Sequence, residues 1–315
     1  MKAAVINAFG TPYVFKIADV PEPAIRDNDI LIETIAGSVN PVDWKQRKGN
    51  HRFLFGSPFP IVLGYDVSGT VIKTGSKVQE FKTGDRVCGV LNNKYGGGLG
   101  QFSRGSQTCF AHVPSSIDLS VSAALPLAGL TALQALRNKG MIKHGMKVMI
   151  IGAAGGVGHY AIQIARIFET EVYAVSSAKH KEFIDRLVPN TFIDYKQEDI
   201  LKILEHFDII FDTIGTYSFP ECKHLLKPKG VYINTLPRPK FIWHKLQAIF
   251  TMGKRARTLL MHQNQQDLNL LIGWVQTGLM KIRIDKEFVI NEISQAHMYS
   301  EAGRTEGKIL IRYTW

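Results

Sequence analysis

The sequence predicts an α/β protein that combines a doubly wound parallel sheet with a separate region of short β-strands. From about residue 123 onward, apolar segments of strand length alternate with segments of helical composition. Residues 1 to about 120 instead read as short strands divided by glycine, proline and asparagine, with few helical periods. These two patterns together indicate two domains of different architecture.

The expected strands of the alternating region are short and apolar, and they lie at 147–151, 171–175, 191–194, 207–211 and 230–234. A helix is expected before them over 123–139, with Pro126 near its first turn. Near the end of the chain, strand character returns on both sides of a helix over 292–302, which Gly303 would terminate.

The domain boundaries follow from where the pattern changes. A β domain is expected over 1–122 and completed by 263–315, and a nucleotide-binding domain is expected over 123–262. We expect the tail to rejoin the first domain because one domain inserted within another leaves the two termini together.

Residues 147–169 carry the main functional signal. A buried strand runs into a glycine-rich turn, and a helix with one apolar face follows. Without Cβ atoms in the turn, backbone N–H groups and the positive end of the helix can approach a phosphate. The spacing is G-x-x-G-G-x-G rather than the usual G-x-G-x-x-G. We expect Gly155, Gly156 and Val157 to contact a pyrophosphate.

The next expected strand, 171–175, ends without an acidic residue. An acidic side chain there would bind the ribose hydroxyls and repel a 2′-phosphate, whereas hydroxyls followed by basic residues suit that phosphate. We therefore expect NADPH rather than NADH, with Ser176, Ser177, Lys179 and His180 around the 2′-phosphate. The alternative is that the lysines at this helix start are merely solvated.

Charge, cysteine content and apolar runs limit the ligands, the covalent or metal sites and the location that are expected. A formal net charge of +11 on 315 residues favours polyanions, which include NADPH, anionic lipid surfaces and nucleic acid, without selecting among them. The three cysteines, at 88, 109 and 222, indicate neither a disulfide framework nor a Cys-x-x-Cys metal site. No apolar run is long enough to span a bilayer, and the first residues lack the regions of a signal peptide. A soluble, cytoplasmic protein is expected.

Seven collinear motifs give the chain a family resemblance: AGSVNPVDWK, GYDVSGTV with GDRVCG, ALPLAGLTALQAL, GAAGGVGHYAIQIA, FIDYKQED, FDTIG and EAGRTEGKILI. In this order and spacing they resemble the zinc-free quinone oxidoreductase (zeta-crystallin-like) branch of the medium-chain dehydrogenase/reductase superfamily. NPVDWK, YGGGL and AGLTALQAL are most similar to the plant chloroplast-envelope quinone oxidoreductase homologues and related enone reductases. The resemblance implies a GroES-like β domain, a Rossmann domain, bound NADPH and a homodimer.

The chain departs from the zinc-dependent relatives at the metal motif. Those relatives use a cysteine, a Gly-His-Glu motif and a later Cys or Asp to hold a catalytic zinc. Here 39–43 offers no thiolate, and Gly64-Tyr65-Asp66 replaces Gly-His-Glu, so no metal site is expected. The implied reaction is metal-free hydride transfer from NADPH to a quinone or to the β-carbon of an α,β-unsaturated carbonyl.

The resemblance assigns two candidate catalytic residues, and the position of the lost zinc ligand gives a third. Asn40 would lie near the nicotinamide, and Lys45 would reach the nicotinamide ribose or the substrate oxygen, where a cation favours developing enolate charge. Tyr65 would donate to the acceptor oxygen. Each has a structural alternative: Asn40 precedes a proline in a turn, Lys45 lies in a basic run, and Tyr65 fills the volume of the missing metal.

Further residues are assigned to the cofactor by their motif positions. The resemblance places Tyr195 beside the adenosine phosphate, and it places Thr131, Ile214 and Leu236 near the nicotinamide. Arg304, with Thr305, would touch the cofactor from the returning tail.

Residues 237–260 interleave apolar and basic side chains. Such a segment suits peripheral membrane contact through a basic surface or, less favoured, binding to nucleic acid. We favour an apolar side that lines the substrate cleft and basic residues that face water. The alternative function is an NADPH-binding protein of weak turnover that acts by association with a membrane surface or RNA. Turnover of quinones and enones distinguishes the two functions.

Overall fold

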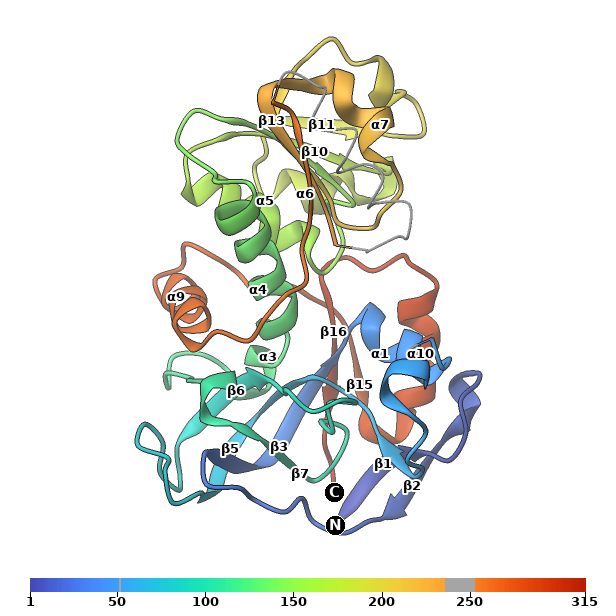
Figure 1. Ribbon diagram of the computed structural model, residues 1–315, viewed down its shortest axis with the longest axis vertical. Coiled ribbons are helices and arrows are strands. Elements are labelled where there is room, and N and C mark those ends of the chain that lie inside the picture. The colour runs from blue at the N-terminus through green and yellow to red at the C-terminus, as the bar shows by residue number, and fades with distance from the viewer. Residues whose placement is uncertain (51, 236–252) are drawn as a thin grey trace. The chain divides into compact units, whose positions relative to one another are not determined.

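The structure is a computed structural model that describes residues 1–50, 52–235 and 253–315 (Figure 1). It divides into two compact units, of which unit 1 comprises Met1–Leu130 and Gln263–Trp315, and unit 2 comprises Thr131–His262. The sequence prediction placed the first boundary after residue 122, whereas the units divide within helix α4 (Pro126–Leu133).

Unit 1 is built on β-sheet. Its larger sheet has the order β15-β16-β3-β5-β6-β8, and β7 also pairs with β3. These strands are β3 (Asp29–Val39), β5 (Asp66–Thr74), β6 (Arg86–Val90), β7 (Phe102–Ser106), β8 (Phe110–His112), β15 (Ile284–Val289) and β16 (Lys308–Arg312). A smaller sheet, in the order β2-β1-β4, contains β1 (Lys2–Ile6), β2 (Phe15–Asp19) and β4 (Ile61–Val62).

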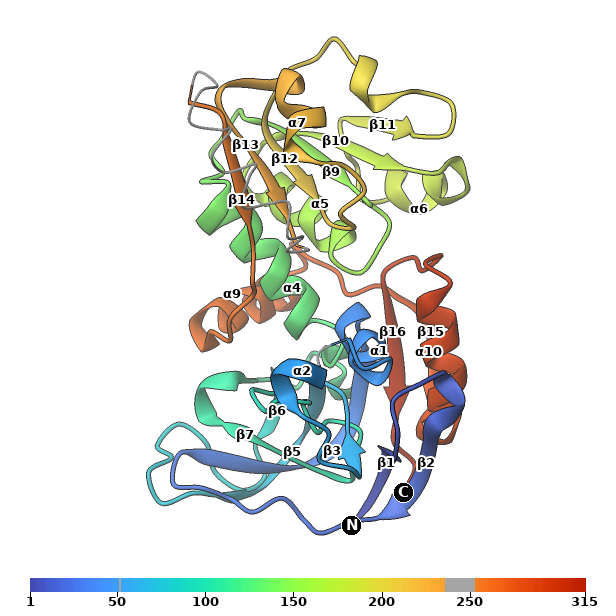
Figure 2. The same cartoon turned by 45° about the vertical axis from the view of Figure 1, so that its right-hand side comes forward.

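The C-terminal tail forms part of this unit. β16 pairs antiparallel with β3, so that Ile309 lies opposite Val39, and both views show the two termini side by side (Figures 1 and 2). Ile6, Phe288 and Ile311 belong to one buried cluster, so residues from both ends of the chain share a core. Burial of apolar surface therefore holds the tail in unit 1.

Five helices accompany these strands: α1 (Pro41–Arg47), α2 (Arg52–Phe55), α3 (Leu119–Ser122), α9 (Gln265–Gln276) and α10 (Ile293–Glu301). α10 agrees with the helix expected over 292–302, and Gly303 follows it with a φ of 65°, a left-handed conformation that ends helices. β3 and β5 pair antiparallel, and a Cβ at Gly69 of β5 would lie 2.0 Å from the Glu33 carbonyl oxygen of β3. Only glycine fits at this position.

Unit 2 is a parallel sheet of the order β11-β10-β9-β12-β13-β14 (Figure 2). Its strands are β9 (Lys147–Ile151), β10 (Glu171–Ser176), β11 (Thr191–Asp194), β12 (Phe207–Asp212), β13 (Leu226–Asn234) and β14 (Arg255–Thr258). The helices α5 (Gly158–Ile167), α6 (Lys181–Asp185) and α7 (Phe219–Cys222) connect them. Strand order reverses between β9 and β12, which is the doubly wound Rossmann order, and the predicted α/β class is confirmed.

In unit 2 and in the helix that leads into it, the structure differs from the prediction at three places. The helix expected over 123–139 begins at Pro126 as α4 and continues directly into a π-helical segment at Gln134–Lys139, which ends with a bond from the Gly140 N–H to the Ala135 carbonyl. β13 begins at Leu226 because the strand continues through an irregularity in its pairing with β12. β14 was not predicted, since its sequence RART is too polar to read as a buried strand.

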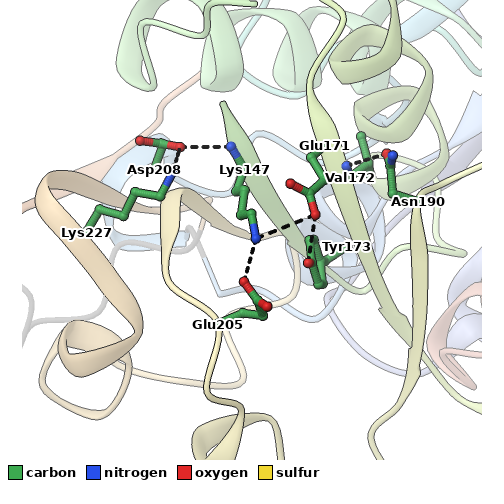
Figure 3. A network of polar contacts seen from close by, with 8 residues as sticks. All are labelled: Lys147, Glu171, Val172, Tyr173, Asn190, Glu205, Asp208 and Lys227. Atoms are coloured by element: carbon green, nitrogen blue, oxygen red, sulfur yellow. Dashed lines mark hydrogen bonds and ion pairs between the residues drawn. The ribbon is translucent and has the colours of Figure 1, made fainter. Parts of the chain in front are cut away.

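The starting ends of the parallel strands are joined by ion pairs (Figure 3). The Lys147 ammonium lies 2.5 Å from Glu205 and 3.6 Å from Glu171, and Asp208 accepts from the Lys147 N–H and the Lys227 ammonium. These contacts link the N-terminal ends of β9, β10, β12 and β13, at the end of the sheet opposite the glycine-rich turn. Among the described residues, no helix combines the length and the apolar content needed to cross a bilayer.

Candidate cofactor site and active-site residues

The glycine-rich turn joins the end of β9 to the start of α5. Its conformation depends on Gly152 and Gly158. Gly152 has a φ of 78°, and a Cβ there would lie 2.6 Å from Thr213 Oγ1. A Cβ at Gly158 would lie 2.2 Å from the Gly152 carbonyl oxygen, so glycine lets the helix pack directly on the turn.

The middle of the turn is open. A Cβ at Gly155 would meet no atom of the described residues closer than 3.5 Å, so packing among them does not require glycine there. The Gly155 N–H donates to the Gly152 carbonyl at 3.1 Å, whereas no acceptor among the described residues takes the N–H groups of Gly156 and Val157. Unpaired N–H groups at a helix N-terminus carry partial positive charge and suit a phosphate. These predicted residues thus fit a pyrophosphate.

The turn is tied to the end of the next strand. The N–H groups of Gly152 and Ala153 both donate to the Val175 carbonyl, at 3.2 and 3.1 Å. Ser176 and Ser177 follow directly and are buried, and the Tyr195 N–H donates to the Ser176 carbonyl at 3.2 Å. The structure therefore gathers the residues predicted for the adenosine end at the carboxyl ends of β10 and β11.

The two lysines after β10 differ in their surroundings. The Lys181 ammonium lies 2.6 Å from Asp185, one turn along its helix. Lys179 is exposed, and it makes no ion pair with any of the residues that the structure describes. His180, between them, is buried. Lys179 is therefore the lysine with a charge available to a phosphate, a distinction that the sequence alone did not make.

Sequence reasoning missed Asp212, which ends β12 and is fully buried. Its carboxylate accepts from the N–H groups of Ile214, Gly215 and Tyr217 at 3.1, 2.7 and 2.9 Å. The Tyr232 hydroxyl lies 3.0 Å from this carboxylate and 2.6 Å from the Tyr217 carbonyl oxygen. The signal was an acidic residue at the end of the apolar run FDIIFD, where a buried carboxylate needs several donors.

Asp212 fixes the loop that carries Ile214. The Ile214 side chain is 55% exposed, and its Cγ2 would lie 2.9 Å from a Cβ at Gly152, so it stands beside the glycine turn. Thr131, also predicted for the cofactor, is buried in α4 at the start of unit 2. Leu236 lies outside the described residues. Arg304 is an exposed residue of unit 1, on the turn after α10.

In unit 1, the candidate Lys45 projects from α1. Asn40 caps this helix, and its N–H donates to the Asp43 carboxylate at 2.7 Å. The Lys45 side chain is half-buried, with its ammonium 5.5 Å from the centre of the Trp44 ring, and desolvation lowers its pKa. No carboxylate of the described residues pairs with it. A partly desolvated, unpaired ammonium is suited to an anionic oxygen.

Asn40 itself is buried and fully engaged. Its side-chain Nδ2 donates to Asp66 Oδ2 at 2.8 Å, and its Oδ1 accepts from the Lys308 ammonium at 2.5 Å. The Asn40 amide thus points toward Asp66 and Lys308, which supports a structural role for Asn40 in the turn before α1.

Tyr65 is likewise held by its neighbours. Its hydroxyl donates to the Lys94 carbonyl at 2.7 Å and accepts from Gln46 Nε2 at 2.5 Å. Burial raises the pKa of the phenol to about 12. The hydroxyl hydrogen is already used, so these contacts favour the volume-filling role over donation to a substrate.

The residues around Asp66 do not suit a catalytic zinc. Asp66 Oδ1 accepts from the Leu127 N–H at 2.8 Å, while Oδ2 accepts from Ser38 Oγ at 2.7 Å and lies 3.3 Å from the Lys308 ammonium. Zinc needs three protein ligands, usually from cysteine, histidine or carboxylate. In the described part of the chain no three such side chains are grouped to hold a metal ion. Here an ammonium already balances the carboxylate.

Two family models match the chain, the alcohol dehydrogenase GroES-like domain over residues 26–119 and the zinc-binding dehydrogenase over residues 190–311. The chain is 32% identical to the chloroplast envelope quinone oxidoreductase homolog of Arabidopsis thaliana, over 93% of this chain and 92% of the relative. It is 31% identical to the 2-methylene-furan-3-one reductase of Solanum lycopersicum, over 99% of this chain and 79% of the relative.

A solved structure agrees with these relatives. The quinone oxidoreductase from Coxiella burnetii superposes with a TM-score of 0.91 at 33% identity, and the match covers 99% of both chains. The sequence motifs, the two architectures and the relatives thus agree along almost the whole chain. The chain belongs to the medium-chain dehydrogenase/reductase superfamily, among the quinone oxidoreductase homologues and enone reductases.

Proposed function

We propose that the protein is an NADPH-dependent oxidoreductase that reduces quinones, or the β-carbon of α,β-unsaturated carbonyls, without a metal ion. Relatives named as a quinone oxidoreductase homolog, a 2-methylene-furan-3-one reductase and an NADPH-dependent alkenal/one oxidoreductase support this reaction class. The structural observation that carries the proposal is the turn before α5, where the N–H groups of Gly156 and Val157 have no acceptor among the described residues.

The choice of NADPH rests on the end of β10. The N–H groups of the turn would hold the pyrophosphate, and Ser176, Ser177 and Lys179, which forms no ion pair within the described part of the chain, would hold the 2′-phosphate of the adenosine. A cation beside hydroxyl donors favours a phosphate dianion through charge-assisted hydrogen bonds. No acidic residue stands at this strand end to favour the unphosphorylated ribose.

When bound, the reduced nicotinamide supplies a hydride. The electron pair that the acceptor gains moves through its conjugated system to the carbonyl oxygen, and this negative charge must be stabilised. We propose that the Lys45 ammonium binds that oxygen, since its partial burial strengthens the interaction and no carboxylate of the described residues competes for it. Solvent water then completes the product by donating a proton.

Two measurements test the proposal together. Consumption of NADPH, followed at the nicotinamide absorbance band, is expected with 9,10-phenanthrenequinone and with a short enone. Calorimetric titration is expected to give a lower dissociation constant for NADPH than for NADH. Binding of NADPH without turnover on a broad acceptor panel would contradict the proposed reaction. Such an outcome would favour a role by association.

The alternative function draws no support from the described residues, because most of the basic segment 237–260 lies outside them. We also propose a homodimer, in which β14 continues the sheet of unit 2 into a second copy. β14 is the last strand of that sheet, and its outer edge has no partner strand in the described chain. Light scattering after gel filtration would measure the mass in solution.

A further inference from the structure

A lysine ammonium is buried in the interior of unit 1. Lys308, the first residue of β16, is 3% exposed. Its Nζ lies 2.5 Å from Asn40 Oδ1 and 3.3 Å from Asp66 Oδ2. The motif EGKILI contributed to the family resemblance, but the sequence assigned this lysine no role.

A buried ammonium is stable only where a charge and hydrogen-bond acceptors compensate for its lost hydration. Asp66 provides the charge, and Asn40 provides the shorter hydrogen bond. Because both partners are themselves buried, solvent and salt screen this pair weakly. The three residues come from the tail, from the end of β3 and from the start of β5.

This cluster acts on α1 through its capping residue. Asn40 spans the cluster, because it donates to Asp66 with Nδ2 and accepts from Lys308 with Oδ1. Its backbone N–H donates to Asp43 in the first turn of α1. The orientation of the Asn40 side chain and the start of the helix are therefore coupled, and Lys45 is the fifth residue of that helix.

We propose that Lys308 is a positioning residue whose ammonium pairs with the buried Asp66 carboxylate and, through Asn40, fixes the helix that presents Lys45. This inference rests on the proposed function only for the role of Lys45. The positive partner of Asp66 is thus a side chain of the protein itself.

The test compares Lys308→Met with the double variant Lys308→Met/Asp66→Asn. The single variant leaves the Asp66 charge uncompensated, so a lower Tm is expected. The double variant removes both charges, and its Tm is expected to recover, because replacing a buried ion pair as a unit is close to neutral. Recovered stability separates positioning from folding. Both variants lack the hydrogen bond that the Lys308 ammonium donates to Asn40 Oδ1.

Three readouts follow from this design. In the double variant, kcat with 9,10-phenanthrenequinone is expected to stay roughly tenfold to hundredfold below the original protein. The NADPH dissociation constant is expected to be unchanged, since the glycine turn lies in unit 2. Amide hydrogen exchange of residues 41–48 is expected to accelerate while that of 66–74 stays the same.

The outcomes are decisive in either direction. Recovery of both Tm and kcat in the double variant, with unchanged exchange in 41–48, would overturn the positioning role and leave a purely structural ion pair. The exchange measurement needs no substrate, so it decides the inference even if the original protein shows no turnover. Absence of turnover in the original protein would instead count against the proposed function.

Discussion

Lys45 and Lys48 lie one turn apart, yet their surroundings differ. The Lys48 ammonium lies 2.5 Å from Glu301 and 4.9 Å from the centre of the Trp44 ring. Lys45 is half-buried and has no carboxylate partner within the described residues. Formal charge is the same at both positions, so the difference in pairing is what makes Lys45 the candidate for stabilising an oxyanion.

Replacing Lys45 is therefore expected to impair turnover without impairing the fold. Lys45→Ala should lower kcat roughly 100-fold, the usual cost of removing one donor from a developing oxyanion. Lys48→Ala is the matched control, with kcat expected within about twofold. Steady-state kinetics with 9,10-phenanthrenequinone and a melting curve measure both effects. Equal losses in the two variants would remove Lys45 from the mechanism.

The cofactor preference is expected to depend on Lys179. Lys179→Glu should weaken NADPH binding far more than NADH binding, because only NADPH carries the 2′-phosphate that the new carboxylate repels. Lys181→Glu is the control, since that lysine already pairs with Asp185. Calorimetric titration of both cofactors provides the comparison. Equal weakening of NADPH and NADH by Lys179→Glu would count against the assignment.

Asp43 makes stability depend on pH. Burial raises the pKa of its carboxyl from the ordinary 3.8 to about 7, and its Oδ1 has no partner among the described atoms. Between these two values the folded protein keeps a proton that the unfolded chain has released. This group's contribution to stability therefore falls as the pH rises from about 4 to 7, and the loss persists at higher pH.

Asp43→Asn removes that titration while keeping an oxygen that can accept from the Asn40 N–H. The free energy of unfolding of the variant, relative to the original protein, is expected to increase as the pH rises from 4 to 8. Denaturant unfolding at several pH values measures the difference. A difference that is constant across this range would show that Asp43 does not titrate as its burial implies.

At the scale of elements, the loop after β12 is organised by one carboxylate. Asp212 holds the N–H groups of three loop residues and thereby places Ile214 beside the glycine turn. Asp208, at the opposite end of the same strand, instead pairs with Lys227 (Figure 3). Asp212 ends the strand and therefore orders the loop that follows it. Asp208 lies near the start of the strand and therefore joins the ion pairs at that end of the sheet.

This difference predicts a selective effect on binding. Asp212→Asn should weaken NADPH roughly tenfold, because an amide cannot accept from all of these donors as a carboxylate does. The fragment 2′,5′-ADP should bind unchanged, since the residues proposed to hold its phosphate lie at the end of β10. Asp208→Asn should lower Tm but leave both affinities intact. Calorimetry that shows equal losses for NADPH and the fragment would contradict this role of Asp212.

Elements with strong local signals were predicted well from the sequence. β9 was expected at 147–151 and is Lys147–Ile151, because a run of buried apolar residues followed by glycines has few other solutions. Where pairing between distant segments decides the structure, prediction failed: β14 is polar, and it is a strand because it pairs with β13. The helix expected over 123–139 is present from Pro126 to Lys139, with its last six residues in π-helical form.

For the candidate site, too, local motifs could be predicted from the sequence and contacts between distant residues could not. The turn from Gly155 to Val157 is local, so its motif was sufficient to find it. The contact between Lys308 and Asn40 joins residues 268 positions apart, and no spacing rule predicts it. Tyr65 shows the same limit, since only the structure reveals that its hydroxyl donates to the Lys94 carbonyl.

For the whole molecule, the two units carry different parts of the proposed reaction. Unit 2 contains the turn proposed to bind the dinucleotide, and unit 1 contains Lys45 and the cluster around Asp66. The net charge of +11 favours an anionic cofactor in general, but it does not specify one. We propose that this chain transfers a hydride to a conjugated acceptor with a lysine, and not a metal ion, as the positive group.

The most direct test follows the hydride itself. Protein treated with a chelator is incubated with NADPH deuterated at the transferable position and with a short enone, and the product is analysed by mass spectrometry and NMR. We predict one deuterium on the β-carbon and a rate equal to that of untreated protein. Product without deuterium, or activity that is lost on chelation and restored by Zn²⁺, would contradict the account.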